Sequence, residues 1–343
     1  MVSESSEAQG NRAEKPIGSL AAKFADASNR LAHKVVGQYV LVERLLLGLL
    51  SDGHLLVEGA PGLAKTRAIK SLSEIIEGDF HRVQFTPDLL PGDLTGTDIY
   101  QPADASFTFK KGPIFHNLVL ADEINRAPAK VQSALLEAMA ERQVTIGSTS
   151  HNLPDLFMVM ATQNPIEQEG TYPLPEAQLD RFLMHVRVDY PSRDLEGEIV
   201  ALARAEALGD LSRSPSDTTP ESPILTLADI NQARTEVLST FTSPAIDEYI
   251  VQLILATRKP SAYAADLGDW IQFGASPRGT IGLDRVSRAR AWLNGRDYVS
   301  PDDVQKTIHD VLRHRIILSF SAEAEGITPD RVIDRLLDLV PVT

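Results

Sequence analysis

The chain has 343 residues, 43% of them hydrophobic and 23% charged, which is an ordinary composition for a globular protein of about two domains. Its 33 basic and 47 acidic residues give a formal net charge of −14, which argues against a surface that binds polyanions in general. The lack of cysteine excludes disulfides, thiolate metal sites and cysteine nucleophiles. Because the start of the chain does not read as a secretion signal and no apolar run reaches membrane-spanning length, we expect a cytoplasmic protein.

In chain order, residues 1–18 are polar and are predicted to be a disordered tail, and a first helix is predicted over Leu20–Leu31. Five short apolar runs then alternate with helical segments, of which Ala129–Glu141 has the clearest apolar stripe. This alternation predicts an α/β core over residues 19–206, with a five-stranded parallel sheet flanked by helices. The strands are predicted at Leu55–Glu58, His81–Phe85, Leu118–Asp122, Phe157–Thr162 and Met184–Val188.

The rest of the chain divides into insertions, a linker and a second domain. Two stretches of the core, at about residues 86–116 and 143–155, interrupt the alternation and are predicted to form hairpins. A Ser/Pro-rich stretch predicts a linker at 207–224. Beyond it the strand signals stop and helix-start signals recur, so residues 225–343 are predicted to form an all-α lid domain. Those start signals are Thr226 with Asp229, Ser243-Pro244, Ser276-Pro277, Ser300-Pro301 and Thr328-Pro329.

The most informative stretch lies between the first predicted strand and the next helix, and it reads as a nucleotide-phosphate loop. A Gly-rich turn at this position directs backbone N–H groups and the positive end of the helix dipole at an anion, and a Lys-Thr pair completes a triphosphate and Mg²⁺ site. Ala64 replaces the second glycine of the usual pattern, and we expect binding to survive one added methyl group. The alternative is a Gly-Pro turn with no ligand. The loop consists of Gly59, Ala60, Pro61, Gly62, Leu63, Ala64, Lys65 and Thr66.

Two carboxylates close the third predicted strand, at the edge where open α/β sheets bind ligands. Asp122 can hold Mg²⁺ directly or through water, and Glu123 can polarise an attacking water. By itself the pair could be a solvated acidic turn. After a phosphate loop, it is the partner that such a loop needs.

Three more residues decide what kind of nucleotide protein this is. Asn164 ends the fourth strand, which we place between the phosphate-loop strand and the Asp122 strand, and its amide can hold the attacking water. Arg181 follows a predicted helix with no evident reason to contact its own nucleotide. Arg278 starts a helix of the second domain. Each alone also reads as a turn asparagine, a surface ion pair or a helix-start charge.

Taken together, these residues resemble the AAA+ ATPases, and the match narrows to the MoxR family. The resemblance extends over nearly all of residues 31–335. The stretches that carry it are Val35-Val36-Gly37-Gln38, the phosphate loop, Phe85 to Asp93, Ala121 to Pro128, Gln163 to Phe182 and Gly274 to Arg278.

The resemblance implies a ring, typically a homo-hexamer, with ATP and Mg²⁺ at each subunit boundary. In this scheme Val36 and Gly37 lie against adenine, Lys65 binds the β- and γ-phosphates, Thr66 and Asp122 hold Mg²⁺, and Glu123 activates water. Asn164 is the first sensor, Arg181 the arginine finger that reaches the neighbour's γ-phosphate, and Arg278 the second sensor. Whether Arg278 acts on its own ATP or on the neighbour's stays open, as does whether the two hairpins line a central pore.

Three functions compete at this point. The leading one is a motor ATPase that remodels or matures a protein partner, with metal-cofactor insertion as one form of maturation and a von Willebrand factor A-domain protein as one kind of client. The second is a nucleic-acid-remodelling ring, which the net charge disfavours. The third is a nucleotide-dependent assembly scaffold, which the complete set of Glu123, Asn164 and Arg181 disfavours.

Overall fold

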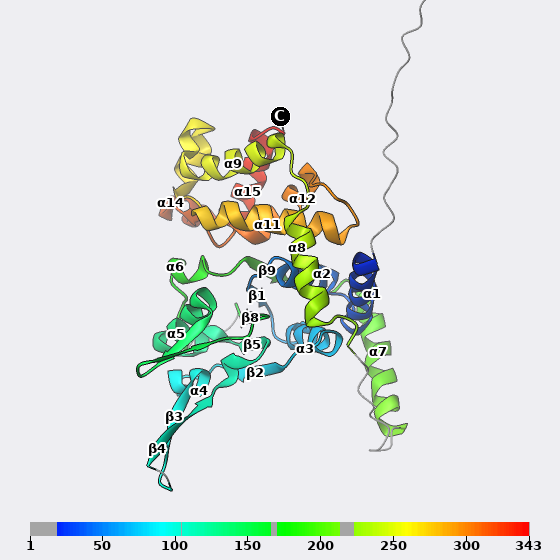
Figure 1. Ribbon diagram of the computed structural model, residues 1–343. Coiled ribbons are helices and arrows are strands. Elements are labelled where there is room, and N and C mark those ends of the chain that lie inside the picture. The colour runs from blue at the N-terminus through cyan, green and yellow to red at the C-terminus, as the bar shows by residue number, and fades with distance from the viewer. Residues whose placement is uncertain (1–18, 104, 166–169, 213–222, 343) are drawn as a thin grey trace, which may run out of the picture.

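The computed structural model describes residues 19–103, 105–165, 170–212 and 223–342, and it stacks a helical domain on an α/β core (Figure 1). The predicted disordered tail at 1–18 lies outside the described residues. Among the described helices, none is both long and apolar enough to cross a membrane.

The core is built on a five-stranded parallel sheet, as predicted. Its strands follow the order β2-β5-β8-β1-β9, so β8 lies between β1 and β5 and the carboxyl ends of all five strands share one edge. The predicted bounds of β5 and β9 are confirmed, and those of β2 and β8 are shifted by one residue. The strands are β1 (Leu55–Gly59), β2 (Phe80–Gln84), β5 (Leu118–Asp122), β8 (Met158–Gln163) and β9 (Met184–Val188).

Alternating side chains of the central strands enter two separate hydrophobic clusters, because successive residues of a strand point to opposite faces. In β5, Leu118 and Leu120 pack on one face with α1 (Ser19–Lys34), α2 (Tyr39–Leu50) and α3 (Lys65–Ile75). Val119 and Ala121 pack on the other face with α4 (Pro91–Thr95) and α5 (Ala129–Glu141). The predicted helix Ala129–Glu141 is confirmed. All four β5 side chains are fully buried, and the sheet is therefore covered on both faces.

Two antiparallel hairpins project from the core. The first pairs β3 (Gly96–Gln101) with β4 (Ser106–Lys111), and the second pairs β6 (Gln143–Ile146) with β7 (Thr149–Asn152). The ring of Phe109 in β4 stacks on the ring of His151 in β7, with 4.0 Å between the centroids. The hairpins therefore contact each other beyond the sheet. Two short 3₁₀ turns, η1 (Pro113–Phe115) and η2 (Ile124–Arg126), flank β5.

After β9 the chain enters α7 (Arg193–Ser212), and the linker boundary predicted at residue 207 falls within this helix because its Ala/Glu/Leu-rich sequence continues to favour helix. The helical domain follows, and the five predicted start residues are confirmed as N-caps. Its described residues depart from all-α at a short antiparallel ladder between β10 (Ile271–Phe273) and β11 (Ile317–Leu318) and at an isolated β-bridge between Phe241 and Tyr298. Its helices are α8 (Leu227–Leu238), α9 (Pro244–Arg258), η3 (Pro260–Ala262), α10 (Ala265–Trp270), α11 (Pro277–Leu293), α12 (Pro301–Gln305), α13 (Ile308–Leu312), α14 (Phe320–Ala324) and α15 (Pro329–Leu339).

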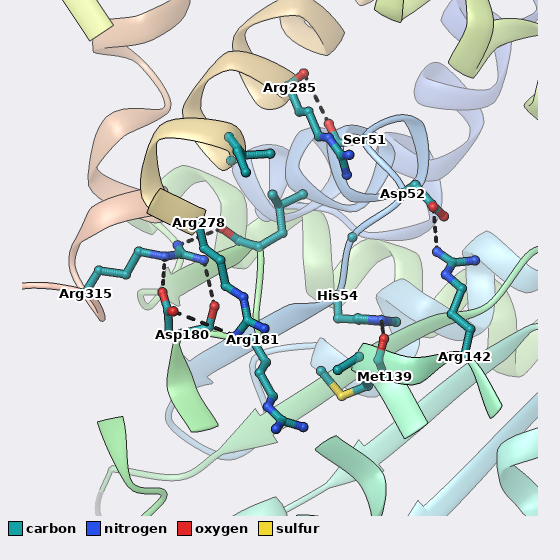
Figure 2. A pocket seen from close by; sticks show the side chains of 15 residues that line it. Ser51, Asp52, His54, Met139, Arg142, Asp180, Arg181, Arg278, Arg285 and Arg315 are labelled. Carbon is teal, nitrogen blue, oxygen red and sulfur yellow. Dashed lines mark hydrogen bonds and ion pairs between the residues drawn. The ribbon is translucent and has the colours of Figure 1, made fainter. Parts of the chain in front are cut away.

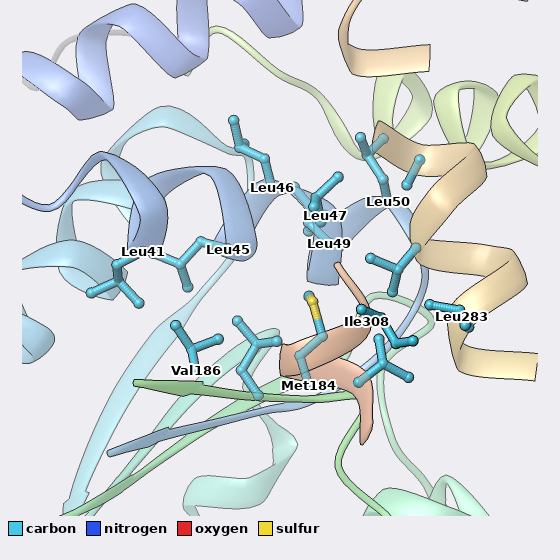
Figure 3. Packing of buried hydrophobic residues seen from close by; sticks show 14 of the residues in the cluster. Leu41, Leu45, Leu46, Leu47, Leu49, Leu50, Met184, Val186, Leu283 and Ile308 are labelled. Carbon is cyan, nitrogen blue, oxygen red and sulfur yellow. The ribbon is translucent and has the colours of Figure 1, made fainter. Parts of the chain in front are cut away.

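The lid is packed onto the core through a shared hydrophobic cluster (Figure 3). Leu50 of α2 and Met184 of β9 belong to the same cluster as Leu283 of α11. A buried ion pair joins the domains beside it, with 2.6 Å between Arg44 Nε and Asp310 Oδ2. The position of the lid is thus fixed by apolar burial and by a charge pair that would be costly to break.

The buried residue His54, which directly precedes β1, makes the free energy of unfolding depend on pH. Burial lowers the pKa of His54 from 6.5 to about 4, and its Nδ1 accepts a hydrogen bond from the Val159 amide at 3.0 Å, which requires a neutral ring. The unfolded chain therefore binds more protons between pH 6.5 and 4, and the stabilisation that is complete above pH 6.5 is lost as the pH falls through that range. We expect about 1.4 kcal/mol of the free energy of unfolding to be lost by about pH 5.5 through His54 alone. Denaturant melts of wild type and His54→Asn between pH 7.5 and 5 would measure this loss, and equal pH slopes would contradict it.

Candidate active site

The phosphate loop joins the carboxyl end of β1 to the amino end of α3. Gly62 has a backbone φ of +83°, in the left-handed region that glycine enters without strain. Ala64 lies in the same region, with φ +57° and ψ +17°, which costs an L-residue roughly 1–2 kcal/mol. The phosphate loop therefore holds Ala64 in a backbone conformation that is strained for alanine. The amino end of α3 follows directly, so its free N–H groups are available to an anion.

Lys65 lies between the loop and the neighbouring strand. Its Nζ donates hydrogen bonds to the carbonyl of Gly59 at 2.5 Å and to that of Gln163 at 3.3 Å. Burial lowers the pKa of Lys65, and the nearby carboxylates of Asp122 and Glu123 partly oppose that shift. The lysine and both predicted acidic residues therefore belong to one electrostatic site at this edge of the sheet.

Thr162, which the sequence analysis missed, organises both acidic residues. This fully buried hydroxyl donates to Asp122 Oδ1 at 2.6 Å and accepts from the Glu123 amide at 2.9 Å. The other carboxylate oxygen of Asp122 accepts from Arg82 of β2, at 2.6 Å from Nη2. A threonine near the end of a buried strand, two residues before Asn164, was the available signal.

The carboxylate of Glu123 is held by donors of its own chain. Its Oε2 accepts from Gln84 Nε2 and from Arg126 Nη1, both at 2.8 Å. The backbone at Glu123 has a φ of +56°, a left-handed conformation supported by the hydrogen bond of its amide to Thr162. A water that approaches Glu123 at Oε2 must therefore displace or share one of these donors.

The oxygen ligands that Thr66 and Asp122 offer fit a magnesium ion bound beside a triphosphate. The Thr66 hydroxyl and the Asp122 carboxylate are hard oxygen ligands of the kind that Mg²⁺ prefers. Arg82 already pairs with Asp122 Oδ2, so Mg²⁺ would share this carboxylate with the guanidinium or displace it. Asn164 follows the end of β8 and is buried beside these residues.

Thr162→Val should remove the hydrogen bonds to Asp122 and Glu123 while keeping the size of the side chain. Valine fills the same space but leaves Asp122 Oδ1 without a donor and the Glu123 amide without an acceptor. We expect a loss of about 1–3 kcal/mol in the free energy of unfolding and a fall in kcat. Thr162→Ser keeps the hydroxyl and is the matched control, so equal kcat values for the two variants would contradict this role.

Gly37, predicted to lie against adenine, borders a cavity of about 610 Å³ between the start of α2 and the lid. Lys306, Asp310 and Arg313 line the lid side of this cavity, and Arg187 and Asp189 line it from the carboxyl end of β9. Since β9 pairs with β1, this cavity opens at the same edge of the sheet as the phosphate loop. Val36 is half-buried next to it in sequence.

Arg181 and Arg278 come together in a different place, a cavity of about 290 Å³ shown in Figure 2. Asp180, next to Arg181, caps the carboxyl end of α6 (Glu176–Leu179) and lies 3.8 Å from the Arg278 guanidinium. Arg181 donates to the carbonyl of Leu136 in α5 at 2.5 Å. The other cationic residues that line the cavity are Arg142, Arg285 and Arg315.

This cationic cavity lies at the edge of the sheet opposite to the phosphate loop. Its wall includes His54 and Leu183, which directly precede β1 and β9, whereas the loop follows the end of β1. The phosphate-loop residues, all of them described, are absent from its lining. A five-residue strand separates the two edges by roughly 15 Å. The structure thus unites Lys65, Asp122 and Glu123 in one site and Arg181 with Arg278 in another.

The comparisons with known proteins agree with this architecture. Residues 54–184 match the ATPase family associated with various cellular activities (AAA), and residues 267–336 match the AAA lid domain. Chaperone MoxR1 of Mycobacterium tuberculosis is 48% identical over 308 residues, which cover 89% of this chain and 78% of that protein. Protein MoxR of Paracoccus denitrificans is 35% identical over 335 residues, covering 94% of this chain and 96% of that protein. A structure from Cytophaga hutchinsonii, assigned as an ATPase, has a TM-score of 0.84 at 44% identity and covers 94% of this chain and 96% of its own.

A parallel sheet with a phosphate loop, packed against a helical domain that matches the AAA lid, defines an ATPase of the AAA class. The protein therefore hydrolyses ATP. The extent of its likeness to the two MoxR proteins narrows the class further. The chain belongs to the MoxR family of AAA+ ATPases.

Proposed function

We propose that this ATPase works as a ring of like subunits, six in the expected case, with ATP bound between neighbours. The observation that carries the proposal is the separation of the two charged sites. Arg181 and Arg278 lie at the opposite edge of the sheet from the phosphate loop of their own chain. Two arginines on a shared surface carry charge opposite in sign to that of a triphosphate. A ring brings that surface against the ATP of the next subunit.

The residue roles follow from this arrangement. Lys65 binds the β- and γ-phosphates at the amino end of α3, and Glu123 orients the attacking water together with Asn164. Thr66 and Asp122 would hold Mg²⁺, which when bound neutralises charge on the phosphates. Arg181 and Arg278 both act on the neighbour's ATP, so we assign the second sensor to the neighbour as well.

We further propose that the client is a protein that the ring remodels or matures. The M. tuberculosis relative is named a chaperone, which supports this reading. The first hairpin supports it too, because Ile99, Tyr100 and Phe107 expose 40%, 51% and 70% of their surface on it. Exposed aromatic and aliphatic side chains suit contact with unfolded or flexible protein segments. In its specific form, the proposal names a von Willebrand factor A-domain protein as the client and the insertion of a metal cofactor as the maturation step.

Mixing two inactive variants tests the shared site. Arg181→Ala keeps an intact ATP site but lacks its finger, and Glu123→Gln keeps the finger but cannot activate water. If the finger acts across the boundary, mixed rings regain ATPase activity because Glu123→Gln subunits complete the sites of Arg181→Ala subunits. Lack of recovery in co-assembled rings would exclude a finger that acts between subunits.

A further inference from the structure

Two arginines of the cationic cavity, Arg315 and Arg278, lie next to one carboxylate, that of Asp180. Its Oδ1 accepts from Arg315 Nε at 2.9 Å, and both of its oxygens lie within 3.0 Å of the Ser276 hydroxyl. Its Oδ2 lies 3.8 Å from Arg278 Nη1. Figure 2 shows Asp180 between Arg315 and Arg278, with Arg181 directly beside it.

Arg315 holds the backbone on both sides of Arg181. It donates to the carbonyls of Asp180 at 3.1 Å and of Phe182 at 2.6 Å, and also to that of Leu183 at 3.2 Å. Its side chain is only 2% exposed. A buried guanidinium needs a counterion, and Asp180 is the carboxylate that it contacts. Arg315 of the lid therefore fixes the core segment that carries Arg181 by hydrogen bonds to its backbone.

Ser276 connects the same carboxylate to Arg278. Its hydroxyl oxygen accepts from the Arg278 amide at 3.1 Å, so Ser276 caps the start of α11 while donating to Asp180. One carboxylate thus fixes the segment of Arg181 in the core and the first turn of the helix that carries Arg278 in the lid.

We propose that Asp180 is a positioning residue that sets the geometry of Arg181 and Arg278 toward the neighbouring subunit's ATP, with Arg315 and Ser276 as its anchors. This inference rests on the proposed function, in which the two arginines act between subunits. Asp180 itself touches no nucleotide. Misplacing a catalytic group by about 1 Å can cost roughly 100-fold in rate, so the loss of this anchor should appear in kcat.

The first experiment is steady-state kinetics of Asp180→Asn, which keeps the shape and removes the charge. We expect kcat to fall about 10- to 100-fold, while the affinity for a fluorescent ADP analogue changes less than about twofold because the chain's own phosphate loop is untouched. Asp266→Asn is the matched control, since it removes a carboxylate from a surface ion pair of the lid with Arg335. Equal kcat values for the two variants would overturn the proposal.

Mixed rings separate this inference from the proposed function. Asp180→Asn is added either to the Glu123→Gln subunit, which donates the finger, or to the Arg181→Ala subunit, which receives it. We expect lost recovery only when it is on the donor, whereas equal recovery in both cases refutes the role of Asp180. If the parent mixture shows no recovery, the finger between subunits is refuted instead.

A second variant covers the case in which Asp180→Asn unfolds. Ser276→Ala leaves the pair of Asp180 with Arg315 intact and removes the hydroxyl that ties this pair to α11. A smaller loss of kcat in the same direction, again only on the donor subunit, supports the proposal, and unchanged recovery contradicts it.

Discussion

Replacement of Arg181 by alanine should abolish ATP turnover and leave ATP binding intact. A cation supplied to a transferring phosphoryl group stabilises charge that develops in the transition state, and such arginine fingers are worth about 10³–10⁵ in rate, or roughly 4–7 kcal/mol. The phosphate loop that binds the ground state lies at the other edge of the sheet, so affinity should persist. Steady-state hydrolysis at saturating ATP and titration of a fluorescent ATP analogue measure the two effects.

Two controls make the Arg181 result specific. Arg335→Ala removes a half-buried arginine of the lid outside the cationic cavity, and its turnover should match that of wild type. Thermal melts check the fold, because Arg181 also donates to the Leu136 carbonyl and its loss removes one hydrogen bond of about 1 kcal/mol. Residual turnover of Arg181→Ala above a tenth of wild type would rule out the finger.

The sheet and the helix starts could be predicted because each depends on local chemistry. Burial on both faces of the sheet shaped the continuous apolar run of β5, and Ser or Thr followed by Pro marked Ser243, Ser276 and Thr328 as caps. The ladder between β10 and β11 escaped prediction because its two strands have three and two residues and pair across more than forty positions. Such short strands carry too few residues to show a period.

The active site could be predicted only in part for a similar reason. Lys65, Asp122 and Glu123 stand in motifs whose spacing carries their chemistry, and the structure brings them to one edge of the sheet. Asp180 and Arg315 are 135 positions apart, and neither has a local pattern that distinguishes it from a surface charge. Only the packing of the lid on the core creates their contact. The opposite placement of Arg181 and Lys65 follows from the parallel direction of β1 and β9, because Arg181 precedes β9 whereas Lys65 follows β1.

Replacement of Glu123 by glutamine should give a protein that binds ATP and does not hydrolyse it. Glutamine retains the size of the side chain and its acceptor oxygen, so the contacts with Gln84 and Arg126 can persist in neutral form. It cannot take a proton from water, and loss of general-base catalysis typically costs 10²–10⁴-fold in rate. Single-turnover hydrolysis together with retention of bound ATP on a desalting column would measure both properties.

The ATP-bound Glu123→Gln protein also distinguishes between the three functions, because it should remain in the state that holds its client. Incubated with lysate of its own cell, it should retain a defined protein in ATP and release it in ADP, with Lys65→Ala, which removes the phosphate-binding ammonium, as the control that captures nothing. Recovery of nucleic acid, sensitive to salt as phosphate contacts require, would instead favour the nucleic-acid motor. Assembly without any bound macromolecule would favour the scaffold, since a remodelling ATPase held before hydrolysis has no route by which to release its client.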